Sequence, residues 1–219
     1  MYDISIIIPA REENIYNKEG DLAPFGDTTL LEWKISQCKE LVDSSNIFIT
    51  SPSDKIKEIC KIEGVNFIKR DKGINFEKVI TDAVTSTGND NILWTNVNSP
   101  FMSVKTYRNI IEKFFALSGD YDSLVTSIEI KEYIFFKNNP LNFDLDSSQT
   151  LRKDLKPILQ LTNGCYLAKK EIFLKQKRLF GKKPFHFLLD SLESIEIKNI
   201  QDYFIANDLI TLFFKKLIT

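Results

Sequence analysis

Short apolar runs alternate with amphipathic helical patterns through the first 130 residues of the chain. The runs have the length of buried strands, and the segments between them carry apolar residues at helical spacing. The pattern predicts strands at Ile4–Ile8, Asn46–Thr50, Val65–Ile68, Ile92–Thr95 and Ser123–Ile128. It predicts helices at Thr29–Leu41, Ser53–Ile62, Phe76–Val84 and Val104–Leu117. A strand–helix–strand rhythm is typical of right-handed crossovers, so we expect an α/β fold with a mainly parallel sheet.

The rhythm changes after residue 130. We interpret about residues 131–190 as an excursion from the sheet, either a lid or a dimerisation arm. The elements expected there and beyond are strands at Tyr133–Phe136, Gly164–Ala168 and Ser194–Ile197, and helices near Lys170–Lys177 and Ile200–Leu217. With this excursion, residues 1–219 are predicted to form a single domain.

Composition excludes several classes of protein. The net charge is −1 and the basic residues are dispersed, which argues against nucleic acid or an anionic membrane as the main partner. Cys38, Cys60 and Cys165 have no Cys-x-x-Cys spacing and no neighbouring histidine, so neither a zinc site nor a disulfide framework is expected. With no leader pattern and no long apolar stretch, the sequence favours a cytoplasmic protein with reduced thiols.

Familiar catalytic motifs are also missing. The first strand is not followed by Gly-x-Gly-x-x-Gly, and no Gly-Lys-Ser/Thr of a phosphate-binding loop occurs. The single histidine, His186, lies between Phe185 and Phe187 without a serine or cysteine motif nearby, which makes a Ser-His-Asp mechanism improbable. We interpret His186 as a packed or interface residue.

Polar side chains follow the predicted strands where each one ends. Pro9 ends the first strand because it has no N–H to donate, and Arg11 and Lys18 lie in the loop that follows. Arg70 follows the third strand, and a polar group follows the fourth: Asn96, Asn98 and Ser99. The carboxyl ends of parallel strands meet at one edge, so these loops can converge on one ligand. Cations and amides suit a polyphosphate, although turn formation explains isolated asparagines equally well.

Matching segments run along nearly the whole chain. They are Ile6–Arg11, Leu30–Ile35, Ser51–Asp54, Gly64–Arg70, Trp94–Phe101, Tyr121–Leu124, Thr162–Tyr166, and Ser194–Lys198 followed by Asp202–Phe204 and Ala206. Their order and spacing resemble the acylneuraminate cytidylyltransferase family, the CMP–sialic acid synthetases and their relatives. The resemblance implies a Rossmann-like three-layer nucleotidyltransferase fold. It also implies transfer of CMP from CTP to an acidic sugar such as a nonulosonic acid, with pyrophosphate released, Mg²⁺ as cofactor, a homodimer, and a role in surface glycan synthesis.

The resemblance also implies roles for individual residues. The backbone of Ala10 and Arg11 would bind the cytosine region, Arg11 and Lys18 would hold phosphates, and Arg70 would border the nucleotide. The residues expected to face the sugar are Asn96, Ser99, Gln149, Asn163 and Tyr166. The reaction would then depend on positioning and charge neutralisation, without a covalent intermediate.

Three departures from the family pattern bear on chemistry. Glu12 and Glu13 add carboxylates to the first loop, which repel a triphosphate unless a metal or lysine intervenes. The glutamine usual after the fourth strand is Asn96 here, which suggests an altered acceptor pocket. The family's Asp-Ile-Asp metal site is Glu196-Ile197-Lys198 in this chain.

That third departure leaves alternatives open. Glu196 can still bind Mg²⁺, but an ammonium has no lone pair, so Lys198 cannot. One hypothesis makes Lys198 a catalytic group, with Arg11 and Lys18, that takes over part of the metal's charge. The other leaves Lys198 in solvent and the chain without catalysis. Activation of a non-sugar acid by CTP and a non-catalytic nucleotide-binding role are the alternative functions.

Overall fold

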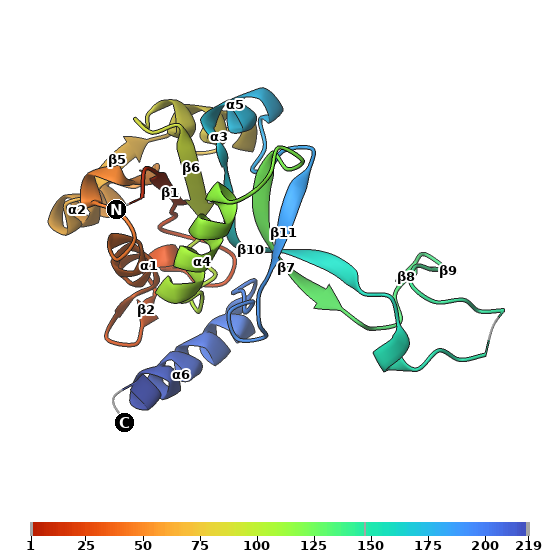
Figure 1. Cartoon of the computed structure of the whole chain (residues 1–219). Coiled ribbons are helices and arrows are strands. Elements are labelled where there is room, and N and C mark those ends of the chain that lie inside the picture. Colours follow the sequence, from red (N-terminus) through yellow and green to blue (C-terminus); the bar gives the residue numbers. More distant parts are fainter. Residues whose placement is uncertain (1, 147, 218–219) are drawn as a thin grey trace.

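The computed structural model describes residues 2–146 and 148–217, and it is built on a seven-stranded sheet (Figure 1). The strand order is β11-β7-β10-β6-β1-β4-β5. Every neighbouring pair is parallel except the two that β10 makes with β6 and β7, so β10 alone runs against the other strands. The strands are β1 (Ser5–Pro9), β4 (Ile47–Ser51), β5 (Asn66–Lys69), β6 (Asn91–Thr95), β7 (Ser123–Ile130), β10 (Ile158–Lys169) and β11 (Pro184–Leu188). The predicted α/β class with a mainly parallel sheet is confirmed.

Helices cover both faces of the sheet. They are α1 (Leu30–Lys39), α2 (Asp54–Glu63), α3 (Phe76–Thr85), α4 (Val104–Phe115), α5 (Lys170–Gln176) and α6 (Ile200–Leu217). Successive side chains of a strand point to opposite faces, so Ile6 and Ile8 of β1 pack with residues of α1, α2, α4 and α6. Ile7 packs on the other face with residues of α3 and α5. The result is a three-layer arrangement with a core on each side of the sheet.

Side-chain caps fix where the helices begin. Thr29 and Glu32 form the predicted capping box at the start of α1, each accepting a hydrogen bond from the other's backbone N–H. Ser53, Asn75 and Ser103 accept hydrogen bonds in the same way at the starts of α2, α3 and α4. Each cap follows a strand or loop at the edge where the site is expected, so the caps also position those loops.

The C-terminal half differs from the prediction in two respects. The excursion expected at about 131–190 is shorter, because β10 and β11 both belong to the main sheet. The strand expected at Ser194–Ile197 is a turn and an extended segment, whereas β11 pairs in register with β7. The strand β11 follows a basic stretch and has His186 in its middle, so it lacks a continuous apolar run. His186 is bonded within this sheet, with Nδ1 at 2.8 Å from the Ser127 hydroxyl.

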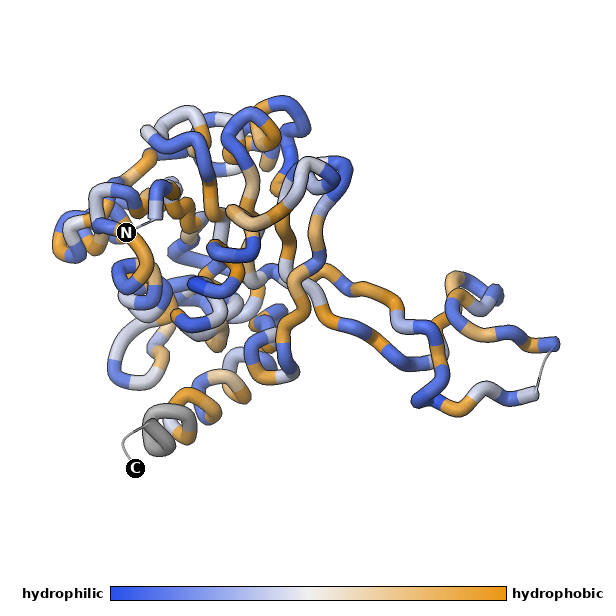
Figure 2. The backbone as a smooth tube through the Cα atoms, viewed as in Figure 1, coloured by the Kyte–Doolittle hydropathy of each residue, from blue (hydrophilic) through white to orange (hydrophobic). Residues whose placement is uncertain are grey.

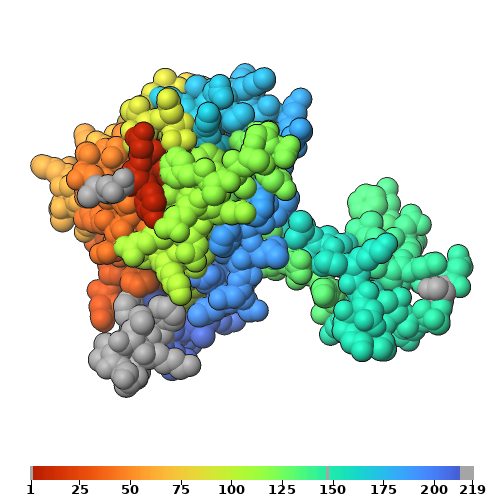
Figure 3. All heavy atoms as spheres, viewed as in Figure 1, coloured from red at the N-terminus to blue at the C-terminus, as the bar shows by residue number. Residues whose placement is uncertain are grey.

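The segment between β7 and β10 forms an arm, residues 131–146 and 148–157, that stands away from the body of the molecule (Figures 1 and 3). Short strand pairs, β8 (Phe135–Phe136) with β9 (Asn139–Pro140) and β2 (Pro24–Phe25) with β3 (Thr28–Thr29), lie on the arm and before α1. Apolar residues recur along the arm (Figure 2), where Leu155 is buried but other large apolar residues are exposed. Within the described ranges, no helix is both long and apolar enough to cross a membrane.

A register shift interrupts β10 between Leu161 and Tyr166, where the arm joins the sheet. Thr126 of β7 fills the break, because its hydroxyl accepts from the backbone N–H of Cys165 at 3.1 Å and from the Thr162 hydroxyl at 2.7 Å. Gly164 lies against this hydroxyl so closely that a Cβ there would be 2.9 Å from Thr126 Oγ1 and 2.3 Å from Met102 Sδ. Glycine is therefore required at position 164 by close packing.

We expect Gly164→Ala to lower the free energy of unfolding by about 1–3 kcal/mol, the usual cost of overpacking a filled core. Thr126 is held by its hydrogen bonds and cannot move aside without breaking them. The measurement is urea denaturation at equilibrium. Gly119→Ala is the matched control, because a Cβ at Gly119 would meet nothing within 4 Å. Equal stability of the two variants would contradict the packing argument.

Candidate active site

A cleft of about 770 Å³ opens at the carboxyl ends of β1, β5 and β6. This edge is where open α/β sheets bind ligands. Of the residues predicted from the sequence, the cleft is lined by Arg11, Arg70, Asn96, Asn98, Asn163 and Lys198. Their loops therefore lie around one cleft, as the sheet geometry predicts, while the roles of these six residues stay predictions.

Two guanidinium groups face the same space. Arg70 is held by backbone carbonyls: its Nη2 donates to the carbonyl of Ala10 at 3.3 Å and its Nε to that of Thr50 at 3.4 Å. Burial, together with the nearby charge of Arg11, lowers the pKa of Arg70. Ala10 itself is fully buried, so it contributes only its backbone carbonyl to this contact with Arg70. Two like charges brought together in this way favour an anionic ligand between them.

Asp21 organises the first loop from beneath. Its carboxylate accepts from the backbone N–H of Arg11 at 2.7 Å, from the Asn14 amide at 3.2 Å and from the Tyr16 hydroxyl. Burial raises the pKa of Asp21 to about 6, although these donors oppose the shift. Burial and the neighbouring Asp21 also raise the pKa of Tyr16, which stays a hydroxyl donor. The loop that carries Arg11 is thus shaped around one buried carboxylate.

The two glutamates of the loop behave differently. The carboxylate of Glu12 accepts from the Ser53 hydroxyl at 2.6 Å and forms an ion pair with Lys55 at 2.6 Å. These contacts lower the pKa of Glu12. Glu13 lines the cleft. The repulsion expected from both carboxylates is therefore reduced at Glu12, where a lysine intervenes.

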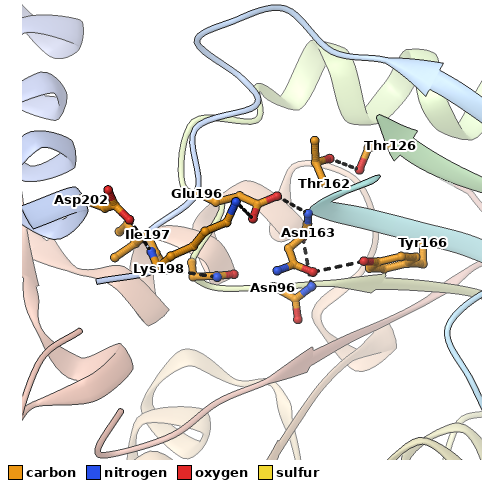
Figure 4. A network of polar contacts seen from close by, with 10 residues as sticks. Asn96, Thr126, Thr162, Asn163, Tyr166, Glu196, Ile197, Lys198 and Asp202 are labelled. Carbon is orange, nitrogen blue, oxygen red and sulfur yellow. Dashed lines mark hydrogen bonds and ion pairs between the residues drawn. The ribbon is translucent and has the colours of Figure 1, made fainter. Parts of the chain in front are cut away.

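Asn96 and Asn163 line the cleft and form an amide wall, to which the Glu196 carboxylate is bonded (Figure 4). The Asn96 amide donates to the carbonyl of Asn163 at 3.0 Å, and the Tyr166 hydroxyl donates to the Asn163 side chain at 3.1 Å. The backbone N–H of Asn163 donates to Glu196 at 2.5 Å. Burial and the Glu196 charge raise the pKa of Tyr166 to about 12. Asn163 is therefore fixed by its backbone and by its side chain.

A buried lysine supports the loop after β6. Lys34 of α1 is fully buried and donates to the carbonyl of Ser99 at 2.8 Å and to the Tyr107 hydroxyl at 2.9 Å. That hydroxyl lies 2.6 Å from Thr95 Oγ1, which donates to the carbonyl of Gly164 at 2.8 Å. Burial lowers the pKa of Lys34 to about 8. Ser99 is 1% exposed and does not line the cleft, so its expected contact with a substrate has no support in this geometry and stays a prediction.

Other predicted residues lie away from the cleft. Lys18 is exposed on a turn of the first loop and does not line the cleft. Gln149 is exposed on the arm and does not line the cleft of its own chain. Tyr166 is 6% exposed, and it acts through the hydrogen bond to Asn163. These positions do not fit direct contact with a ligand within one chain.

Apolar side chains also line the cleft, and they are not predicted from the sequence. This apolar wall consists of Ile15, Ile74, Phe76, Val79 and Val97. Ile15 is 91% exposed and Phe76 is 53% exposed, although both are large apolar residues. Apolar residues in a polar loop and at the start of a helix carry no distinct sequence signal. They provide a surface for a flat or apolar part of a ligand.

Glu196, the residue expected to bind Mg²⁺, already contacts two donors of the protein and does not fit a metal site. Glu196 has a 6% exposed side chain whose oxygens contact the N–H of Asn163 at 2.5 Å and Lys198 Nζ at 3.1 Å. Within the described ranges, no group of three histidine, cysteine, aspartate or glutamate residues could hold a metal ion. Mg²⁺ at a nucleotide site is held by one or two carboxylates together with phosphate oxygens and water, and here an ammonium lies against the expected carboxylate.

Comparison with known proteins identifies the kind of fold to which this cleft belongs. A family model described as cytidylyltransferase matches residues 5–204. An N-acylneuraminate cytidylyltransferase of Streptococcus agalactiae serotype III (strain NEM316) is 19% identical over 175 residues, which are 74% of this chain and 42% of that protein. The chain therefore spans less than half the length of this curated relative.

Solved structures agree on the fold. The structure of CMP:2-keto-3-deoxy-manno-octonic acid synthetase in complex with CTP matches with a TM-score of 0.72 and 8% identity, covering 95% of this chain and 98% of that one. A 4-diphosphocytidyl-2C-methyl-D-erythritol synthase from Anaerococcus prevotii DSM 20548 matches with a TM-score of 0.68 and 14% identity, covering 95% and 98%. The expected Rossmann-like three-layer nucleotidyltransferase fold is confirmed by these matches.

We expect the free energy of unfolding of the wild type, relative to Asp21→Asn, to fall by up to about 3 kcal/mol between pH 4 and pH 6. The folded carboxyl has its pKa raised to about 6, so the folded state binds the proton more tightly than the unfolded chain. Its favourable contribution is therefore complete at low pH and is lost as the pH rises. Urea denaturation at several pH values measures this difference, and parallel pH curves for the two proteins would contradict it.

Proposed function

Because the chain belongs to the cytidylyltransferase family, we propose that it transfers CMP from CTP to an acidic acceptor and releases pyrophosphate. The observation that carries the proposal is the pair of guanidinium groups, Arg11 and Arg70, at the carboxyl ends of β1 and β5. Arg70 is held by two backbone carbonyls and is not neutralised by them, so its charge is available to a triphosphate.

The chemistry asked of the protein is positioning and charge stabilisation. An acceptor hydroxyl attacks the α-phosphorus, the bond from that phosphorus to the bridging oxygen breaks, and pyrophosphate leaves with the bond electrons. The hydroxyl proton passes to solvent. Arg11 and Arg70 would stabilise the charge that grows on the phosphate oxygens, and the apolar wall would take the flat pyrimidine ring.

We propose an acidic sugar such as a nonulosonic acid as the acceptor, for surface glycan synthesis. Asn96 and Asn163 line the cleft and offer amide groups to a hydroxyl-rich molecule. The relatives differ in acceptor, since their names include an acylneuraminate, a keto-deoxy-octonic acid and a methylerythritol compound. A non-sugar acid is therefore the second candidate. Three buried free cysteines suit a reducing compartment, so we assign the reaction to the cytoplasm.

We also propose that the protein works as a homodimer joined through its arm. A two-stranded ribbon cannot bury its own faces, and large apolar residues of this arm and its root are exposed. They include Phe135, Phe136, Leu141, Leu145, Leu151, Leu159 and Leu161. A second copy would cover these residues, and it could bring Gln149 to the partner's cleft, because Gln149 does not reach its own.

The activity test is pyrophosphate release from CTP with a panel of acceptors: nonulosonic acids, 3-deoxy-octulosonic acid, polyol phosphates and non-sugar hydroxy acids. We expect release with one acidic class. Arg70→Ala should weaken CTP binding by about 10- to 100-fold, the value of one or two charge-assisted hydrogen bonds. Lys61→Ala, which removes an exposed lysine from α2, is the control. CTP binding without turnover on any acceptor would favour a non-catalytic nucleotide-binding protein.

The dimer is tested by sedimentation equilibrium over a range of protein concentrations. We expect the wild type to approach twice the monomer mass and Phe135→Ser to dissociate at lower concentration. Phe115→Ser is the matched control, since Phe115 on α4 is 51% exposed and Phe135 is 49% exposed. A monomer mass at every concentration would exclude the dimer and leave the transferase proposal standing.

A further inference from the structure

The segment that carries Lys198 is fixed on both sides where it borders the cleft. The backbone N–H of Ile197 donates to the carbonyl of Asn98 at 2.8 Å, and the Asn98 amide donates to the carbonyl of Ile197 at 3.2 Å. The N–H of Lys198 donates to Asp202, in the first turn of α6, at 2.9 Å. Ile197 is fully buried (Figure 4 shows the arrangement). Hydrogen bonds on Ile197 and on the Lys198 N–H therefore hold the backbone at Lys198 in place.

Glu196 directs the lysine side chain. It lies almost buried beneath Lys198, with one oxygen on the N–H of Asn163 and the other 3.1 Å from Lys198 Nζ. The Lys198 side chain is 56% exposed and lines the cleft. An ammonium has three N–H donors, and Glu196 is the partner it contacts within the described part of the chain. Donors and positive charge therefore remain for a ligand in the cleft.

The same contacts explain why the residues do not fit a metal. A dication would have to displace Lys198 from Glu196, and the two positive charges would repel each other. If both oxygens of Glu196 bound the metal, the N–H of Asn163 would lose its acceptor. Both changes cost free energy in a partly buried site. A fixed ammonium avoids these costs, because it is already present before the ligand binds.

We propose that Lys198 binds the triphosphate as a protein-borne cation, oriented by Glu196, so that nucleotide binding does not require a divalent metal. The inference rests on the proposed function. Lys198, Arg11 and Arg70 then surround the phosphates from loops after β1 and β5 and from the segment before α6. Glu196 is a positioning residue, since it acts through Lys198 and Asn163.

The experiment is calorimetry of CTP binding to the full chain, once with EDTA and once with excess Mg²⁺. We expect the wild type to bind in EDTA, with affinity within about threefold of that in Mg²⁺. Lys198→Met should bind about 10- to 100-fold more weakly in EDTA, as expected for a lost hydrogen bond to a charged group. Lys198→Arg should keep most of the affinity, because it keeps the charge. Lys61→Met is the control for a lost surface lysine.

A gain-of-function variant gives a second readout. Lys198→Asp puts another carboxylate beside Glu196 and removes the ammonium, so CTP binding should become dependent on Mg²⁺. Thermal unfolding checks that each variant is folded. Wild-type binding that requires Mg²⁺, or unchanged binding by Lys198→Met, would overturn the inference and leave the transferase proposal intact. No CTP binding to the wild type in either condition would overturn both.

Discussion

The loop after β6, which borders the cleft, depends on the burial of the Lys34 ammonium. A charged group taken out of water must find hydrogen-bond acceptors, and Lys34 finds them in the Ser99 carbonyl and the Tyr107 hydroxyl. Because these acceptors belong to the loop after β6 and to α4, the demand of one charge fixes the distance between α1, that loop and α4. The loop that carries Asn96 and Asn98 can then have little freedom. Because the buried charge must keep its acceptors in place, this part of the ligand site is held rigid.

The charged groups that line the cleft are held in different ways. The Asp21 carboxylate is part of the lining, but it is 6% exposed and accepts hydrogen bonds from donors of the first loop. Glu196 does not line the cleft, and its oxygens contact donors of the protein. Among the described lining residues, Arg11, Arg70 and Lys198 therefore stand against two carboxylates, Glu13 and Asp21, so the nearly neutral chain presents a site with an excess of positive charge.

The sequence predicted those parts of the site that local pattern and sheet geometry determine. The capping box of Thr29 and Glu32 is a local signal, and the meeting of Arg11 with Arg70 follows from parallel strands sharing one edge. The family resemblance places Ser99 at the substrate. Only the tertiary position of Lys34 shows that the Ser99 carbonyl accepts a hydrogen bond from a buried ammonium. A lysine in an amphipathic helix is ordinarily solvated, so no pattern announces that it is buried.

The same limit explains the errors after residue 130. Gln149 is placed at the sugar by the family resemblance alone, which does not show that this residue lies on the arm. The strand β11 is not predicted because His186 interrupts its apolar run. Asp21 was overlooked because an acidic residue in a polar loop has no distinguishing neighbour. In each case the deciding interaction joins residues distant in sequence, such as β11 with β7. Periodicity reports only on local structure.

β10 links the arm to the site within a single strand. Its first residues, Ile158–Leu161, pair with the outer end of β7, and its last residues, Cys165–Lys169, pair with β6 in the core. The break between them carries Asn163, whose N–H binds Glu196 and whose carbonyl binds Asn96. Any partner that fixes the arm therefore acts on a strand that also holds the amide wall. Thr126 clamps the break from β7, so the arm and the cleft share one set of hydrogen bonds.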